Sequence, residues 1–169
     1  MGGYVGGDSL QKERMMDQQR ISAPKVAPDG SKALRGVEAY LHHCGLEKSL
    51  IELVKMRASQ INGCAYCLDM HSKDARRAGE TEQRLYVLNA WDETSIYTPR
   101  ERAALAWTEA LTPVAETHAP DDVYAGLRPH FSEKEIVDLT ILIGMINLWN
   151  RLAIGMRNQV VADGAAAAA

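Results

Sequence analysis

The stretch ELVKMRASQINGCAYCLDMHSKDARRAG, from Glu52 to Gly79, holds two helical patterns joined by an Asn-Gly pair. Just before and within it, apolar residues recur with a helical period at Leu50, Ile51, Val54, Ala58 and Ile61. This pattern predicts a helix from about Leu46 to Ile61. Asn62 and Gly63 readily take a positive φ, so the pair should end that helix. A second helix is predicted to follow at once, from Cys64 to Gly79.

The rest of the chain shows the same helical spacing, and no β-branched run alternates with polar residues over strand length. A further helix is predicted over Ser31 to Cys44, with Gly45 as its stop. Pro99 fits the first position of another helix. The segments APDDVYAGL and FSEKEIVDLTILIGMINLWNRLAIGMRNQ continue the pattern. Helix caps are predicted at Ser31, Thr81, Thr98 and Ser132. We therefore expect an all-α, single-domain helical bundle.

Composition narrows the class of protein further. The 169 residues suit one domain, predicted over 29–162, between an N-terminal tail of residues 1–28 and an Ala-rich tail of residues 163–169. A net charge of −3 with scattered Lys and Arg argues against nucleic-acid binding. Three cysteines are too few for a disulfide framework and favour a reducing, cytoplasmic setting. The apolar run Leu139 to Asn150 is too short to cross a bilayer, so no membrane role is expected.

Cys64, Cys67 and His71 share one stripe of the predicted helix. At about 100° per residue, Cys64 and His71 point within about 20° of each other, and Cys67 lies about 60° to one side. Residues three apart on a helix lie roughly 5 Å apart, which permits a disulfide with little backbone movement. The first turn also favours a thiolate, because unpaired N–H groups and the helix dipole attract negative charge. His71 lies four residues after Cys67, where it can exchange a proton with that thiol.

Glu52 is the candidate partner that orients His71. If the two helices pack antiparallel across Asn62 and Gly63, Glu52 lies about 16 Å before the turn and His71 about 12 Å after it. A glutamate side chain covers much of that difference. The residues therefore predict a Glu-His-Cys proton relay with a second cysteine that resolves the intermediate.

The run Glu52, Cys64, Cys67 and His71 resembles the core motif of the alkylhydroperoxidase D-like branch of the carboxymuconolactone decarboxylase family. The flanking KMRASQINGCAYCLDMHSKDARRAGET is similar to that family, as are ERAALAWTEAL and NLWNRLAI. The resemblance covers about Ser31 to Arg157. It implies an all-helical fold assembled as trimers or hexamers, and peroxidase or disulfide-reductase chemistry on the dithiol. The resemblance also implies that members lacking the cysteine pair are decarboxylases; a decarboxylase-like activity is therefore an alternative, and the intact pair argues against it here.

Carried over residue by residue, the resemblance makes Cys67 the thiol that attacks the peroxide and Cys64 the resolving thiol. Glu52 and His71 become the proton relay. The best-studied family pattern has a histidine directly before the second cysteine, where this chain has Tyr66. A phenol, with an ordinary pKa of about 10, cannot replace that base at neutral pH. The implied partners are a hydroperoxide substrate and an external dithiol or lipoyl-type reductant, with no bound cofactor and no metal.

Several alternatives stay open at this level. The dipole argument favours Cys64 as the attacking thiol, whereas the position of His71 favours Cys67, which we prefer. Cys64, Cys67, His71 and Glu52 could instead hold zinc, or the cysteines could simply be buried. The chain would then be a non-redox helical oligomer.

Three further residues are candidates for lining the site: Tyr66, Trp149 and Asn150. Trp149 and Asn150 belong to the most apolar predicted helix, where polar groups need partners. The aliphatic stripe of that helix predicts a subunit interface.

Overall fold

The computed structural model describes residues 18–164, and this part of the chain is helical, without strands. The elements are α2 (Ala23–Val26), α3 (Pro28–Leu41), α4 (Lys48–Asn62), α5 (Ala65–Arg77), α6 (Glu82–Tyr86), the 3₁₀ helix η1 (Leu88–Glu93), α7 (Pro99–Leu111), α8 (Val114–Thr117), α9 (Asp121–Leu127) and α10 (Glu133–Met156). The predicted all-α class is confirmed.

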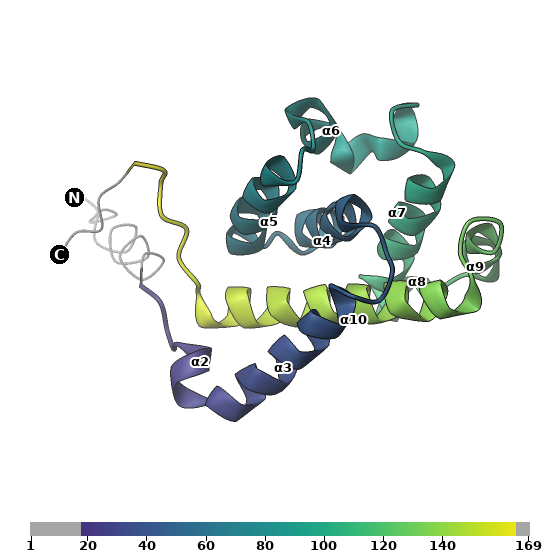
Figure 1. The fold of residues 1–169 in the computed structure, drawn as a ribbon. Coiled ribbons are helices and arrows are strands. Elements are labelled where there is room, and N and C mark those ends of the chain that lie inside the picture. The colour runs from purple at the N-terminus through teal and green to yellow at the C-terminus, as the bar shows by residue number, and fades with distance from the viewer. Residues whose placement is uncertain (1–17, 165–169) are drawn as a thin grey trace, which may run out of the picture.

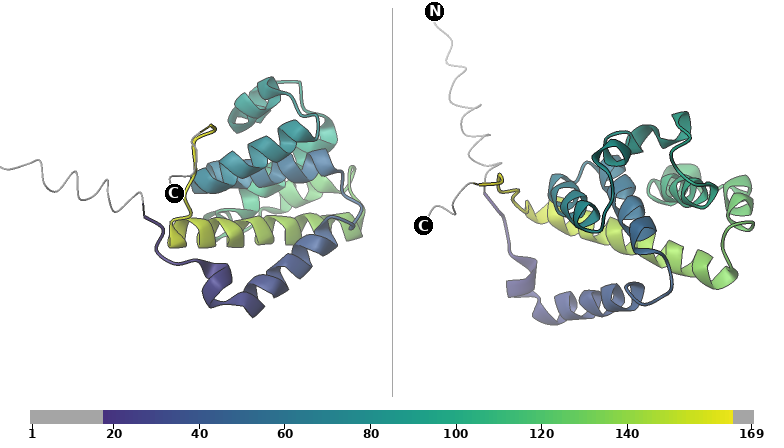
Figure 2. Two further views of the ribbon diagram at one scale, coloured as in Figure 1. Left: turned by 60° about the vertical axis from the view of Figure 1, so that its left-hand side comes forward. Right: turned by 45° about the horizontal axis from the view of Figure 1, so that its top comes forward.

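Helix α4 lies at the centre of the bundle, where it packs against α5, α7 and α10 (Figure 1). Its side chains Leu53, Val54 and Ala58 are completely buried. The long helix α10 runs along one side of the molecule, and α3 flanks it at an angle (Figure 2). Helices α3, α4, α5 and α10 therefore border a common region of the molecule.

Helix α10 is long and apolar enough by composition to span a bilayer. Its residues Leu139, Leu142, Ile143 and Ile146 are instead part of the buried interior. They pack with α3, α4, α5 and α7, so one face of α10 belongs to the core of this bundle. A core helix passes the same length and hydropathy test as a membrane span.

The turn between α4 and α5 follows the prediction closely. Gly63 adopts a left-handed conformation, with φ 65° and ψ 36°, which a residue without Cβ takes at little cost. The N–H of Cys64 donates to the carbonyl of Ser59 at 3.0 Å and completes the helix end. The chain reverses within these residues, so α5 lies beside α4 and Cys64 becomes the N-cap of α5.

Two predicted helix boundaries are wrong. The first helix starts at Pro28 rather than after Ser31, because the fixed φ of proline suits the first helical position. It ends at Leu41, before the predicted Cys44. Thr81 caps α6 as predicted, but α6 ends at Tyr86 and a kink at Ala90 interrupts the 3₁₀ turns that follow.

Both predicted caps that pair with a glutamate are confirmed. Thr98 with Glu101 and Ser132 with Glu135 each form a reciprocal capping box at the starts of α7 and α10.

Most of the two predicted tails lies outside the described residues. Residues 18–28 contain α2, and the N–H of Arg20 donates to the carbonyl of Met156 at 2.9 Å, so this segment lies against the end of α10.

The cap of α10 predicts a pH-dependent stability. Hydrogen bonds from the backbone and hydroxyl of Ser132, and then from Arg100, lower the pKa of Glu135 to about 2. Since this pKa is below the ordinary 4.5, the stabilisation is fully present above that ordinary pKa and is lost as the pH falls toward the lowered one. We expect Glu135→Gln to lower the free energy of unfolding by about 1–2 kcal/mol at neutral pH, after allowance for partial exposure, and by less at pH 3. Urea unfolding at pH 7 and pH 3 measures this, and an equal loss at both would contradict it.

Candidate active site

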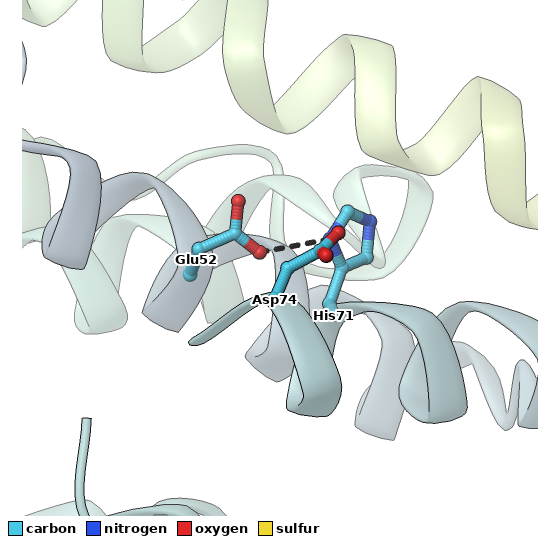
Figure 3. A group of neighbouring side chains, drawn as sticks. All are labelled: Glu52, His71 and Asp74. Atoms are coloured by element: carbon cyan, nitrogen blue, oxygen red, sulfur yellow. Dashed lines mark hydrogen bonds and ion pairs between the residues drawn. The ribbon is translucent and has the colours of Figure 1, made fainter. Parts of the chain in front are cut away.

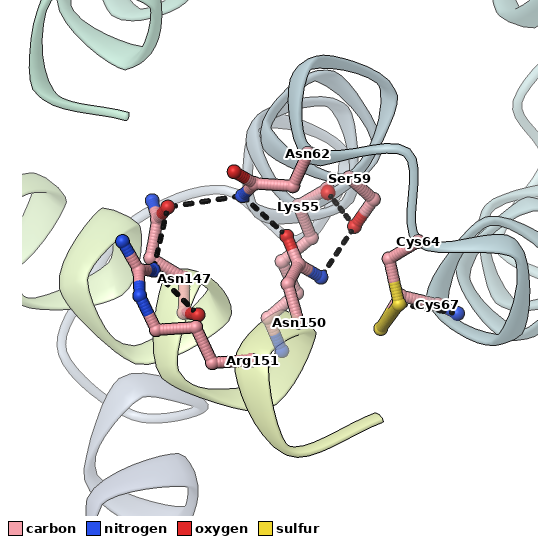
Figure 4. The surroundings of a disulfide bond; sticks show 8 residues. All are labelled: Lys55, Ser59, Asn62, Cys64, Cys67, Asn147, Asn150 and Arg151. Atoms are coloured by element: carbon pink, nitrogen blue, oxygen red, sulfur yellow. Dashed lines mark hydrogen bonds between the residues drawn. A yellow bond between two sulfur atoms is a disulfide. The ribbon is translucent and has the colours of Figure 1, made fainter. Parts of the chain in front are cut away.

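The cysteine pair lies at the N-terminus of α5, where the sequence places it. Cys64 is the N-cap, and its Sγ accepts the backbone N–H of Cys67 at 3.4 Å. The two Cα atoms are 5.4 Å apart, and the sulfur atoms are joined as a disulfide (Figure 4). Sulfur at this position faces the unpaired amides and the positive end of the helix dipole. The helix start therefore favours a thiolate when the pair is reduced.

Glu52 and His71 meet across the α4–α5 packing. Nδ1 of His71 and Oε2 of Glu52 are 2.9 Å apart, and both side chains are largely buried (Figure 3). An ionised carboxylate can only accept, so Nδ1 carries the proton and Nε2 is left to exchange protons. The structure thus brings together the two residues that the sequence analysis pairs, and it gives the imidazole one defined tautomer.

Asp74 is a third polar group at this point, which the sequence analysis missed. The ligand atoms of Glu52, His71 and Asp74 all lie within 4.8 Å of one another. Asp74 follows His71 by three residues on α5 and so shares its face, which is the signal that was available in the sequence. Arg77, one turn further on, pairs with Asp74.

A cavity of about 580 Å³ opens beside these groups. Cys67 is among its lining residues and Cys64 is not, so the second cysteine is the one that a ligand in the cavity meets. Several of the lining residues precede or belong to α2 and α3, far from the motif in sequence. The lining consists of Gln19, Ser22, Ala23, Pro24, Ser31, Glu38, His42, Glu52, Lys55, Tyr66, Cys67, Met70, His71, Asp74, Trp149, Leu152, Ala153 and Asn158.

Of the three predicted lining residues, Tyr66 and Trp149 border the cavity. Asn150 lies elsewhere, fully buried between α4 and α10. Its Oδ1 accepts from Asn62 at 2.8 Å, and its Nδ2 donates to the hydroxyl of Ser59 at 3.1 Å (Figure 4). Asn150 therefore ties the end of α4 to α10 just before the turn that carries Cys64.

A buried ion pair forms another part of the cavity wall, and the sequence analysis did not anticipate it. The side chain of Lys55, on α4, is only 5% exposed, and its Nζ lies 2.8 Å from Oε2 of Glu38 on α3. The other oxygen of Glu38 accepts the indole N–H of Trp149 at 2.9 Å. Three helices are thus joined through one carboxylate at the edge of the site.

The family can now be assigned by comparison with known proteins. The model of the carboxymuconolactone decarboxylase family matches residues 28–110, which include the cysteine motif. The uncharacterised protein YdfG of Bacillus subtilis is 45% identical over 141 residues, 83% of this chain and 96% of that protein. The chain belongs to the carboxymuconolactone decarboxylase family. Within this family it is of the alkylhydroperoxidase D-like type.

One solved structure supports this alkylhydroperoxidase D-like assignment, and a more distant one shares the fold. A protein of unknown function from Agrobacterium tumefaciens, provisionally described as the antioxidant defence protein AhpD, superposes with a TM-score of 0.84 at 47% identity. The match covers 86% of this chain and all of that one (100%). An uncharacterised peroxidase-related protein from Silicibacter shares the fold at 20% identity and a TM-score of 0.71, over 95% of this chain and 88% of that one.

Proposed function

We propose that the protein is a thiol-dependent peroxidase and disulfide oxidoreductase. One observation carries the proposal: Cys67, at the start of α5, lines the same cavity as the hydrogen-bonded pair of His71 and Glu52. A thiol that reacts with a peroxide needs a stabilised anion, an accessible face and a proton donor for the leaving oxygen. All three needs can be met within this cavity. The relatives, which include a protein provisionally described as the antioxidant defence protein AhpD, favour a peroxidase-related role.

The proposed cycle balances with one hydroperoxide and one external dithiol. The Cys67 thiolate attacks the outer peroxide oxygen, the O–O bond breaks, and the alkoxide takes a proton to leave as an alcohol. The resulting sulfenic acid condenses with the Cys64 thiol, which releases water and forms the disulfide. An external dithiol, of the lipoyl type, then reduces that disulfide by exchange and is itself oxidised.

His71 supplies the proton to the alkoxide in this scheme, and Glu52 holds its ring in place. The carboxylate stabilises the imidazolium and keeps Nε2 available for the transfer. Tyr66 borders the cavity at the position where well-studied relatives have a histidine. The relay proposed here therefore has a single imidazole.

The proposal is tested by peroxide consumption with a panel of reductants that includes a lipoyl protein, thioredoxin and a small dithiol. We expect saturable consumption that needs one of these donors, with one alcohol formed for each dithiol oxidised. Consumption no faster than that of the free dithiols would contradict the proposal.

A divalent metal is the second candidate, because Glu52, His71 and Asp74 have ligand atoms close enough to share an ion. The zinc set considered from sequence relied on both cysteines, whose sulfur atoms are here bonded to each other. Elemental analysis beside the alkylation rates of the reduced thiols separates the two functions. Stoichiometric metal with two slow thiols would favour a metal site over the redox cycle.

We also propose that the protein is a homo-oligomer, a trimer or hexamer, that works in the cytoplasm. Helix α10 exposes apolar side chains that share one face at helical spacing, those of Val137, Ile141 and Leu148. Contiguous apolar side chains of this kind mark interaction sites in soluble proteins.

Charge placed on this side of α10 should dissociate the oligomer. We expect Ile141→Glu with Leu148→Glu to reduce the mass measured by light scattering to that of a monomer, because two carboxylates cannot be buried unpaired. Tyr86→Glu, at a residue that is 73% exposed on α6, is the matched control and should leave the mass unchanged. A monomeric wild-type protein would contradict the interface.

A further inference from the structure

We propose that the cavity beside Cys67 selects uncharged organic hydroperoxides over those that carry a carboxylate, because Glu38 masks the lysine in its wall. This inference rests on the proposed peroxidase site and names its substrate class. Two properties of the cavity carry it: its size with its apolar lining, and the pairing of its charged groups.

The cavity is far larger than hydrogen peroxide needs. Its volume of about 580 Å³ lies within the range of pockets that hold small organic molecules. Much of the lining is apolar, and the apolar members are Ala23, Pro24, Met70, Trp149, Leu152 and Ala153. A hydroperoxide with an aryl or alkyl body can therefore bury that body here while its O–O group faces Cys67.

The charged groups of the lining disfavour an anion. Three carboxylates border the cavity, those of Glu38, Glu52 and Asp74. Lys55 is the only lysine or arginine among the described lining residues, and its Nζ is already 2.8 Å from Glu38. A ligand carboxylate would lose water in this cavity without an unpaired ammonium or guanidinium to receive it, in a wall where carboxylates outnumber lysine and arginine. A Cys67 thiolate adds a further negative charge in the reduced enzyme.

Glu38 is held firmly in the position that masks Lys55. One of its oxygens binds Lys55, and the other accepts the indole N–H of Trp149 at 2.9 Å. If Glu38 turned away to free the ammonium, both hydrogen bonds would break. Glu38 is thus a specificity-determining residue that acts through Lys55.

The test compares two alcohols that mimic the product and undergo no redox chemistry. Cumyl alcohol is uncharged, and its para-carboxylate has the same body with one negative charge. Binding of each to the full chain is measured by titration calorimetry at pH 8. We expect the carboxylate to bind about tenfold more weakly or worse, since a charge that loses water without a cationic partner is strongly disfavoured.

Two variants test the assignment to Glu38. Glu38→Gln keeps an acceptor for Trp149 but frees the Lys55 ammonium, so the affinity ratio should narrow or invert in favour of the carboxylate. Asp74→Asn removes a different carboxylate of the cavity lining, beside Glu52 and His71, and should also narrow the affinity ratio. This second variant keeps the test possible if Glu38→Gln fails to fold. Glu47→Gln is the control, because Glu47 pairs with Arg100 outside this cavity and should leave the ratio unchanged.

Equal affinities in the wild-type protein, or binding of neither alcohol, would overturn the inference. A ratio that stays unchanged in every folded cavity variant would overturn it too, because the wall charges would then play no part. Turnover of the matching hydroperoxides is measured separately. A protein that prefers the uncharged alcohol but consumes neither hydroperoxide would support this inference and contradict the peroxidase proposal.

Discussion

Replacing Cys67 with serine is expected to lower peroxide turnover by about 10³-fold or more, because the nucleophile is the one group that the cycle cannot replace. Serine keeps the size of the side chain but gives no comparable anion at neutral pH. The measurement is the initial rate of hydroperoxide consumption with the best reductant from the panel. The reduced variant should also stay unmodified when it is treated with hydroperoxide and weighed by mass spectrometry.

Two matched variants show which thiol attacks. Cys64→Ser should still react once and keep one added oxygen on Cys67, since the resolving thiol is gone. Cys44→Ser should behave as wild type, because Cys44 is a free cysteine outside the cavity lining. If Cys64→Ser stays unmodified and Cys67→Ser gains the oxygen, the attacking thiol is Cys64, as the dipole argument alone would have it.

Replacing His71 with glutamine should reduce turnover of alkyl hydroperoxides by about 10²-fold, the usual contribution of a general acid. The loss should depend on the leaving group. An alkoxide needs a proton as it leaves, whereas a peroxy acid releases a stable carboxylate that does not. We therefore expect a large loss with cumene hydroperoxide and a small one with a peroxy acid, in rates of reaction with the reduced enzyme.

Glu52→Gln should show the same dependence on the leaving group with a smaller loss, because it keeps the hydrogen bond but removes the charge that stabilises the imidazolium. His42→Gln is the control. His42 also borders the cavity but is the C-cap of α3, whereas Glu52 and His71 belong to α4 and α5. An equal loss for both oxidants in His71→Gln would contradict proton transfer and leave His71 a structural residue.

Local chemistry explains why so much of the fold is readable from the sequence. The turn at Gly63 and the capping boxes of Ser132 and Thr98 depend only on residues within one helical turn. The start of α3 was missed because Pro28 and Ser31 are both acceptable near a helix start, and only packing shows that Ser31 is buried.

The candidate site, too, has residues whose placement follows from the sequence and one whose placement does not. Cys64, Cys67 and His71 belong to one short helical segment, so helical periodicity places them on a common stripe. Glu52 could be paired with His71 because a single tight turn joins their helices. Asn150 shows the limit of this reasoning: it is polar in an apolar helix, as noted, but its partners are Ser59 and Asn62 rather than the cavity.

By itself, the sequence determined the helical class, the turn between α4 and α5, and the stripe that carries the cysteines and His71. These features depend on residues a few positions apart, whose geometry is set by the backbone. Only the tertiary structure decided that Cys67 rather than Cys64 borders the cavity, and that Glu38 and Lys55 join the predicted Trp149 in its wall. Those contacts join α3, α4 and α10 across long stretches of chain, and no local pattern encodes which side chains meet there.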